Sequence, residues 1–200
     1  MQKKQIFSSL LQKNKKKRVY LSEMHTNDKE IIEGCIRKDK KSQRILYDKY
    51  AGILFAVCRK NSQSKEDAED IFQEAFIRLY SSLEKYSYLG SFEGWLKKFF
   101  MREAWNYYRN RKDKYSRVEI GESVVPVDEN TILDKFSNQQ LIDCLQQLAN
   151  KERIILVMSE IEGLSWEEIA QNVNLEIPTI RSMCSRAKKK LLYIFNNYNK

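Results

Sequence analysis

The chain has 200 residues, of which 42% are hydrophobic and 32% are charged, so it can bury the core of one or two small domains in a soluble protein. Its formal net charge of +9 favours a polyanionic partner, either nucleic acid or an anionic membrane surface. No apolar run reaches the roughly 18 residues of a membrane span, which argues against membrane insertion. The apolar residues near the N-terminus are too few for a signal peptide, and we expect a cytoplasmic location.

The cysteines and the single histidine do not form a metal-binding pattern. Cys35, Cys58, Cys144 and Cys184 lie far apart in the sequence, and the only histidine is His25. A zinc site needs clustered nitrogen and sulfur ligands, so no metal and no cofactor is expected. Free thiols buried in a reducing compartment are the preferred interpretation.

Residues 1–26 form a basic tail, in which no acidic residue precedes Glu23. Such a block of like charges repels itself and is predicted to be disordered. Met24 stands just before the first convincing helix, which raises the hypothesis that translation begins there. The mass of the native protein tests this hypothesis.

The remainder of the chain is predicted to be all-α. Only six glycines and two prolines are present, and apolar residues recur at helical spacing. The predicted organisation is two small helical domains, over residues 27–112 and 136–200, joined by a flexible acidic linker over residues 113–135.

Polar residues predict where the helices of the first domain begin. Asp28 is expected to cap the first helix, and the second begins at about Ser42. Ser64 is the predicted N-cap of the third helix. A loop over residues 84–90 then precedes a fourth helix, capped by Ser91.

The C-terminal segment has the pattern of a helix-turn-helix. Ser165 and Glu168 fit a capping box at the start of a short helix, Trp166 to Val173, and a longer helix runs from Pro178 to about Tyr193. Such a second helix can enter the major groove of DNA. The other interpretation, a solvated basic helix of an ordinary bundle, explains fewer of these features together. The outer side of the longer helix, which begins at Pro178, is predicted to carry Thr179, Arg181, Ser182, Ser185, Arg186, Lys188 and Lys189.

The fourth helix of the first domain carries cations interleaved with aromatic residues. Phosphates attract such cations, and unstacked bases stack on aromatic rings, so the pattern suits single-stranded DNA. The alternative is that Trp105 and the flanking Tyr107 and Tyr108 belong to the core and that the cations are merely solvated. The residues that share this face are Lys98, Arg102, Trp105, Arg109 and Lys112.

The third helix carries acidic residues opposite its apolar side. Asp67, Asp70 and Glu74 are spaced by three and four, and Gln73 lies beside them. DNA repels such a stripe, so a basic protein surface is the better partner. Spacing alone is also compatible with a merely solvated face.

Nothing in the sequence indicates an enzyme. It contains no Ser/His/Asp set, no glycine-rich phosphate loop and no metal cluster. The adjacent carboxylates Glu167 and Glu168 diverge on a helix and are assigned to helix capping.

Two stretches of the sequence resemble the extracytoplasmic-function (ECF) group of the sigma-70 family. The segments ILYDKYAGILFAVCRK, DAEDIFQEAFIRLY and GSFEGWL resemble region 2. LIDCLQQLANKERIILVMSEIEGLSWEEIAQNV and PTIRSMCSRAKKKL resemble region 4. The resemblance implies an RNA polymerase sigma factor that directs promoter-specific transcription initiation. Its implied partners are the core polymerase, through the clamp helices of the largest subunit and the flap, together with promoter DNA and an anti-sigma factor.

The resemblance also implies roles for individual residues. Those that match the polymerase-docking part of region 2 are Asp67, Asp70, Gln73 and Glu74. Those that match the segment recognising and opening the −10 element are Tyr86, Ser91, Trp95, Lys98, Arg102, Trp105, Asn106 and Arg109. The −35-reading helix is matched by Thr179, Arg181, Ser182, Ser185 and Arg186, with Lys188 and Lys189 on the same basic face.

Some positions depart from the family pattern. Met183 stands where the family usually has a basic residue, and this apolar side chain on a DNA-facing helix is expected to alter the promoter preference. Asn174 stands where glycine is common in the turn.

Two other functions are compatible with the sequence. A stand-alone helix-turn-helix regulator is the alternative function, and a basic protein whose tail binds membranes is a third hypothesis.

Overall fold

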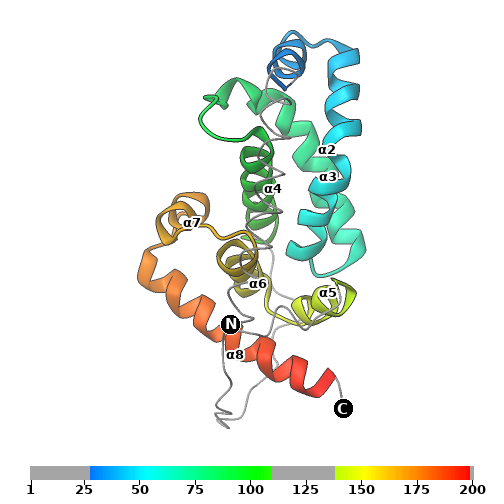
Figure 1. Ribbon diagram of the computed structural model, residues 1–200. Helices are drawn as coiled ribbons and strands as arrows, with labels where there is room; N and C mark the ends of the chain where they lie inside the picture. Colours follow the sequence, from blue (N-terminus) through cyan, green and yellow to red (C-terminus); the bar gives the residue numbers. More distant parts are fainter. Residues whose placement is uncertain (1–27, 110–137, 199–200) are drawn as a thin grey trace, which may run out of the picture. The chain divides into compact units, whose positions relative to one another are not determined.

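The computed structural model describes residues 28–109 and 138–198. The predicted basic tail and the whole of the predicted acidic linker therefore lie outside the described residues. Within the described ranges every regular element is a helix and no strand occurs, which confirms the predicted all-α class (Figure 1). No helix in these ranges is both long and apolar enough to span a membrane.

The described residues form two compact units. The first contains residues 28–52 and 77–96, and the second contains residues 53–76, 97–109 and 138–198. Helices α2 (Lys40–Asn61), α3 (Lys65–Ser82) and α4 (Phe92–Arg109) each contribute residues to both units. The units therefore do not follow the predicted division of the chain at its linker, and that division stays a prediction.

The start of the first unit differs from the prediction in two ways. Residue 28 is already helical, in a helix over residues 28–36, so the prediction that Asp28 caps this helix is wrong. The Asp28 carboxylate is buried and accepts hydrogen bonds from Tyr50 Oη and Lys49 Nζ. Helix α2 begins two residues before Ser42, because Asp39 caps it: Asp39 Oδ2 accepts a hydrogen bond from the Ser42 amide at 2.9 Å.

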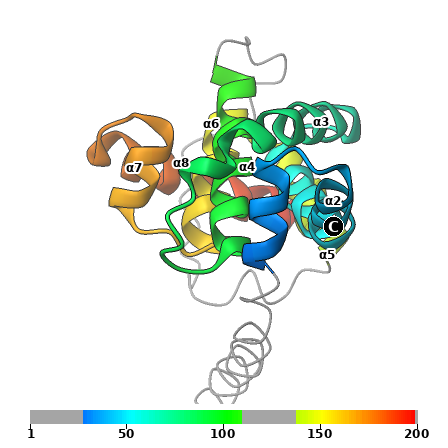
Figure 2. The ribbon, with the colours of Figure 1, turned by 90° about the horizontal axis from the view of Figure 1, so that it is seen from above.

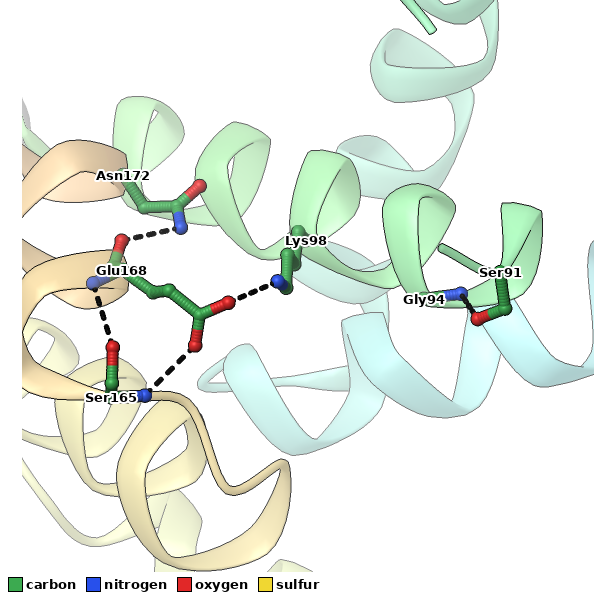
Figure 3. A network of polar contacts seen from close by, with 6 residues as sticks. All are labelled: Ser91, Gly94, Lys98, Ser165, Glu168 and Asn172. Carbon is green, nitrogen blue, oxygen red and sulfur yellow. Dashed lines mark hydrogen bonds and ion pairs between the residues drawn. The ribbon is translucent and has the colours of Figure 1, made fainter. Parts of the chain in front are cut away.

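Two predicted helix caps are confirmed. Ser64 Oγ accepts from the amide of Asp67 at 3.0 Å at the start of α3. Ser91 Oγ accepts from the amide of Gly94 at 3.1 Å at the start of α4 (Figure 3). Each hydroxyl satisfies a backbone donor that has no carbonyl partner in the first turn of a helix. A short 3₁₀ turn, η1 (Leu83–Lys85), follows α3.

Aromatic side chains pack in the core of each unit. In the first unit the ring of Phe92 contacts Tyr50 edge-on at 5.5 Å between centroids and stacks on Trp95 at 5.9 Å. In the second unit Phe76 contacts Phe72 at 4.9 Å and Phe100 at 5.4 Å. Such pairs add about 0.5–1.5 kcal/mol to the burial of the rings, which fixes how the helices that carry them pack.

The C-terminal helices belong wholly to the second unit. Helices α5 (Asn138–Gln146) and α6 (Asn150–Leu156) are followed by a π-helical turn, η3 (Val157–Ile161). Helices α7 (Trp166–Val173) and α8 (Ile177–Tyr198) complete the chain, and α8 packs against α5, α6 and α7 (Figures 1 and 2). The apolar residues that these helices bury completely include Ile155, Ile169, Ile180 and Ala187.

Candidate nucleic-acid and partner interfaces

The predicted helix-turn-helix is present in the second unit. Helix α7 has the predicted bounds, and its capping box is complete: Ser165 Oγ accepts from the Glu168 amide at 3.2 Å, and Glu168 Oε2 accepts from the Ser165 amide at 2.9 Å (Figure 3). Asn174 ends α7 in the left-handed conformation at φ 53°. Asparagine tolerates this conformation better than most residues, so it serves here without a glycine.

Helix α8 presents the predicted polar face to solvent. It begins at Ile177, one residue before Pro178, and runs five residues beyond Tyr193. Lys188 is half-buried and pairs with Glu160 at 3.0 Å, and the Arg181 guanidinium lies over the Trp166 ring at 5.8 Å from its centroid. Six of the seven residues predicted for the outer face of this helix are exposed: Thr179, Arg181, Ser182, Ser185, Arg186 and Lys189.

Met183 does not contribute to this face, and the expectation that it alters the DNA-facing surface is wrong. Its side chain is only 9% exposed and belongs to the core of the second unit. Its neighbours in the buried set, Ile180, Cys184 and Ala187, follow the spacing of three and four that defines one side of a helix. Residue 183 therefore fills the apolar side of α8.

The cationic stripe on α4 is only partly as predicted. Arg102 and Arg109 are exposed, and Lys98 and Asn106 are partly exposed, whereas Lys112 lies outside the described residues. Trp105 is only 3% exposed, so the prediction that it offers an open platform for bases is wrong, and the core interpretation holds for it. Tyr108 is likewise buried, whereas Tyr107 is partly exposed.

The loop before α4 combines a buried anchor with an exposed tip. Tyr86 is buried, donates a hydrogen bond from Oη to the Gly90 carbonyl at 2.8 Å, and contacts the rings of Trp95 and Tyr88. Tyr88 and Leu89 are exposed, Leu89 to 84%. Both residues lie within the loop from Tyr86 to Ser91 that resembles the −10 segment, but neither was singled out there, although two large apolar side chains in a polar loop were a usable signal. Tyr86 shapes the loop, and Tyr88 and Leu89 form its exposed apolar surface.

The acidic stripe on α3 is exposed at three of its four predicted positions. Asp70, Gln73 and Glu74 face solvent. Asp67 is partly exposed and accepts hydrogen bonds from Tyr108 Oη at 2.7 Å and from Tyr107 Oη at 3.0 Å. Burial raises the pKa of Tyr108, and its hydrogen bond to Asp67 raises this pKa further, so the phenol remains a neutral donor.

Arg153 is a buried cation that the sequence analysis missed. Its side chain is 0% exposed, and its guanidinium donates hydrogen bonds to the Leu148 carbonyl, to the Asn61 carbonyl and to Asn150 Oδ1. The guanidinium also lies 5.5 Å from the centroid of the Tyr108 ring. Within the second unit, Arg153 thus joins α6 to the last residue of α2 and to α4.

A further set of ion pairs lies close to the cationic stripe. Lys98 Nζ donates to Glu168 Oε1 at 2.5 Å (Figure 3). Glu162 lies 3.8 Å from Lys60 Nζ and 3.9 Å from Lys97 Nζ. The hydrogen bond from Lys98, followed by that from the Ser165 amide, lowers the pKa of Glu168 below its ordinary value. Among the described residues, no cluster of His, Cys, Asp and Glu has the arrangement of a metal site.

Two segments of the chain match models of known protein families. The model described as Sigma-70 region 2 matches residues 46–114, and the model described as Sigma-70, region 4 matches residues 138–191. Together they span more than half of the chain.

Relatives of known identity agree with these matches. The chain is 27% identical over 180 residues to the ECF RNA polymerase sigma-E factor of Haemophilus influenzae, covering 82% of this chain and 93% of that protein. It is 26% identical over 176 residues to the ECF RNA polymerase sigma-E factor of Escherichia coli, covering 82% of this chain and 92% of that protein. It is 30% identical over 154 residues to the ECF RNA polymerase sigma factor SigE of Mycolicibacterium smegmatis, covering 73% of this chain and 58% of that protein.

Solved structures support the fold. CnrH, in a complex with the cytosolic domain of CnrY, aligns with a TM-score of 0.50 and 17% identity, over 84% of this chain and 96% of that one. The sigma factor RpoE of Bartonella quintana, in a complex with the anti-sigma factor NepR, aligns with a TM-score of 0.51 and 20% identity. The alignment covers 76% of this chain and 96% of that one. With both sigma regions matched in order and relatives aligned over most of the chain, this protein belongs to the ECF group of the sigma-70 family.

Proposed function

We propose that this sigma factor directs promoter-specific initiation by binding core RNA polymerase with one surface of α3 and promoter DNA with α4 and α8. The observation that carries this proposal is the separation of charge. An exposed acidic stripe lies on α3, whereas the exposed face of α8 carries bases and hydroxyls. Opposite charges on separate helices suit one basic protein partner and one polyanion. Because these partners are the transcription machinery and chromosomal DNA, the proposed site of action is the bacterial cytoplasm.

The proposed contacts to the −35 element come from α8. The N-terminal turns of a recognition helix are the part that reaches base edges in the major groove. Thr179, Arg181 and Ser182 lie in these turns and are exposed, and Arg and Ser/Thr side chains can bond to base edges and phosphates. Ser185, Arg186 and Lys189 extend the same exposed face and suit phosphate contacts.

The proposed contacts to the −10 element come from α4 and the loop before it. Lys98, Arg102 and Arg109 supply charge for the phosphates, and Tyr88 with Leu89 supplies an exposed surface for an unstacked base. Tyr86 supports the loop through its bond to the Gly90 carbonyl and its contact with the Tyr88 ring, and Ser91 caps α4. Trp105 is buried, so we propose that it supports α4 and does not touch a base. Preferential binding of unstacked bases shifts the promoter towards its open state with no covalent step by the protein.

The proposed contact to polymerase is made by Asp70, Gln73 and Glu74, with Asp67 at its edge. Their partner is a basic surface on the clamp helices of the largest subunit, and region 4 is proposed to contact the flap. The related RpoE is bound by an anti-sigma factor, and CnrH by the cytosolic domain of CnrY. We extend this to an anti-sigma factor that holds the present chain inactive.

In vitro transcription tests the proposed function directly. Purified protein is added to core polymerase on fragments of the source genome, and the 5′ ends of the transcripts are mapped. Discrete start sites that depend on the added protein, each preceded by shared −10 and −35 sequences, are the expected result. A chain that binds duplex DNA but yields no protein-dependent transcripts would be a stand-alone regulator.

The substitution Arg181→Ala is expected to weaken binding to a −35 duplex. Loss of a base-edge contact costs about 1–3 kcal/mol, which is roughly a 5- to 150-fold loss of affinity. Met183→Leu is the matched control, because Met183 is buried two positions along the same helix and the change conserves volume. Fluorescence anisotropy with a labelled duplex measures both. Equal affinities of the two variants would contradict the assignment of Arg181.

A further inference from the structure

The turn between the first described helix and α2 carries a group of exposed cations. The helix over residues 28–36 ends at this turn, and α2 begins at Lys40 (Figure 1). None of these cations forms an ion pair with another described residue, whereas the neighbouring Arg44 is paired with Asp48 at 2.8 Å. We name the group the basic corner, and its members, which all face solvent, are Arg37, Lys38, Lys40 and Lys41.

The one acid within residues 37–44 does not neutralise the basic corner. Asp39 Oδ2 accepts hydrogen bonds from the Ser42 amide at 2.9 Å and from the Ser42 hydroxyl at 2.6 Å, and Oδ1 accepts from the Lys41 amide at 3.3 Å. This carboxylate therefore serves the backbone donors at the start of α2. The ammonium groups beside it remain directed to solvent.

The backbone of the basic corner is held in one conformation. The Lys38 amide donates to the Cys35 carbonyl and the Asp39 amide to the Gly34 carbonyl, each at 2.9 Å. Lys38 adopts φ 63°, a left-handed conformation that is uncommon for lysine. A Cβ atom at residue 34 would collide with Ser42 Oγ, so the two helices meet closely at Gly34. Cations on such a fixed turn lose less conformational entropy on binding than cations on a flexible segment.

The basic corner belongs to the unit that carries the proposed −10 loop. At the opposite end of the same helix, Asp28 accepts a hydrogen bond from Tyr50, whose ring contacts Phe92 at 5.5 Å. Phe92 in turn contacts Tyr86, the anchor of the loop, at 5.1 Å. A helix rises about 1.5 Å per residue, which places the corner about 14 Å along the helix from Asp28. One turn of duplex DNA spans about 34 Å, so DNA held by the loop passes within reach of the corner.

We propose that the basic corner is a second DNA contact of the first unit, which binds backbone phosphates of the promoter within about one helical turn of the −10 element and reads no base. This inference rests on the proposed function, because it requires the −10 loop to lie on DNA. A lysine ammonium binds phosphate as a point charge, and phosphate contacts fix the position of a protein on the duplex without carrying sequence information. The corner strengthens binding to every promoter and leaves the choice of sequence to α8 and the −10 loop.

A matched pair of variants isolates the charge of the basic corner. Lys40→Gln with Lys41→Gln changes the first two residues of α2, and α2 should be retained because the first turn of a helix disfavours cations. Lys65→Gln with Lys151→Gln is the control. Lys65 is the first residue of α3 and Lys151 the second of α6, both are exposed, and the change in net charge is the same.

The salt dependence of promoter binding tests the contact in the holoenzyme. Each protein is combined with core polymerase, and its affinity for a promoter found by in vitro transcription is measured over a series of salt concentrations. Each lost phosphate contact lowers the slope of log affinity against log salt by about 0.9. The corner variant should have a slope smaller by roughly 1–2 and an affinity at least roughly tenfold lower at about 0.1 M salt, with little difference near 1 M. Equal slopes and affinities of the corner variant and the control would overturn the inference.

Two further measurements test where the contact lies and what it reads. Hydroxyl-radical footprints of the wild-type and corner-variant holoenzymes should differ within about one helical turn of the −10 element. Single base changes in the −10 element should weaken both holoenzymes by the same factor. Identical footprints, or unequal factors, would contradict the proposal of a phosphate contact that reads no base.

The outcomes separate this inference from the proposed function and from a membrane site. If neither the wild-type protein nor the variants form a promoter complex with core polymerase, the proposed function fails and the inference fails with it. If all three form the complex with equal salt slopes, only the corner contact is wrong. Binding to phosphatidylserine vesicles that the corner variant loses, with an unchanged promoter slope, would assign the corner to a membrane surface and overturn the inference.

Discussion

Reversing two charges on α3 is expected to abolish binding to core RNA polymerase. Asp70→Lys with Glu74→Lys places two cations where both acids are exposed and where a basic partner surface is proposed. Like charges brought together across an interface cost several kcal/mol, which corresponds to a loss of roughly 100-fold or more in affinity. Titration of fluorescently labelled protein with core enzyme measures the loss.

The control reverses the same number of charges away from this stripe. Glu30→Lys with Glu84→Lys changes two exposed acids of the first unit and gives the same net charge. The control should bind core polymerase as the wild-type protein does, and both variants should retain affinity for a −35 duplex. If the α3 variant still bound the enzyme, the acidic stripe would be a solvated surface.

Removing the buried cation of α6 is expected to destabilise the second unit. Arg153→Ala leaves the carbonyls of Leu148 and Asn61 buried without their donor and opens space beside the Tyr108 ring. Each unsatisfied buried group costs about 1–3 kcal/mol, so a decrease of roughly 3 kcal/mol or more in the free energy of unfolding is expected. Urea unfolding followed by circular dichroism measures it.

Lys151 provides the comparison for Arg153, because it lies on the same helix and is exposed. Lys151→Ala should change the free energy of unfolding by less than about 0.5 kcal/mol, as is usual for exposed positions. Equal midpoints for the two variants would show that Arg153 contributes little to the packing of α6.

Features set by neighbouring residues could be predicted from the sequence. The caps at Ser64, Ser91 and Ser165 depend on residues within one helical turn, and all three are present. The bounds of α7 follow from its capping box and from Asn174 for the same reason. Asp39 was missed although its signal was equally local, since aspartate is among the preferred N-cap residues and accepts a hydrogen bond from a backbone amide three residues on.

Features that depend on distant segments could not be predicted from the sequence. Trp105 and Met183 lie on helices with both apolar and charged neighbours, and the sequence does not say which side packs against another element. Arg153 was missed because its partners Asn61 and Tyr108 come from helices far away in the chain. The same limit applies to the pairing of Lys98 with Glu168, which are 70 residues apart.

The proposed function requires that the wild-type chain associates with core RNA polymerase. Purified protein, free of any inhibitor, is mixed with core polymerase and separated by size-exclusion chromatography at moderate salt. We predict that the two elute together in a 1:1 complex through the surface formed by Asp70, Gln73 and Glu74. Elution of the chain at its own volume, with none in the polymerase fractions, would contradict the account.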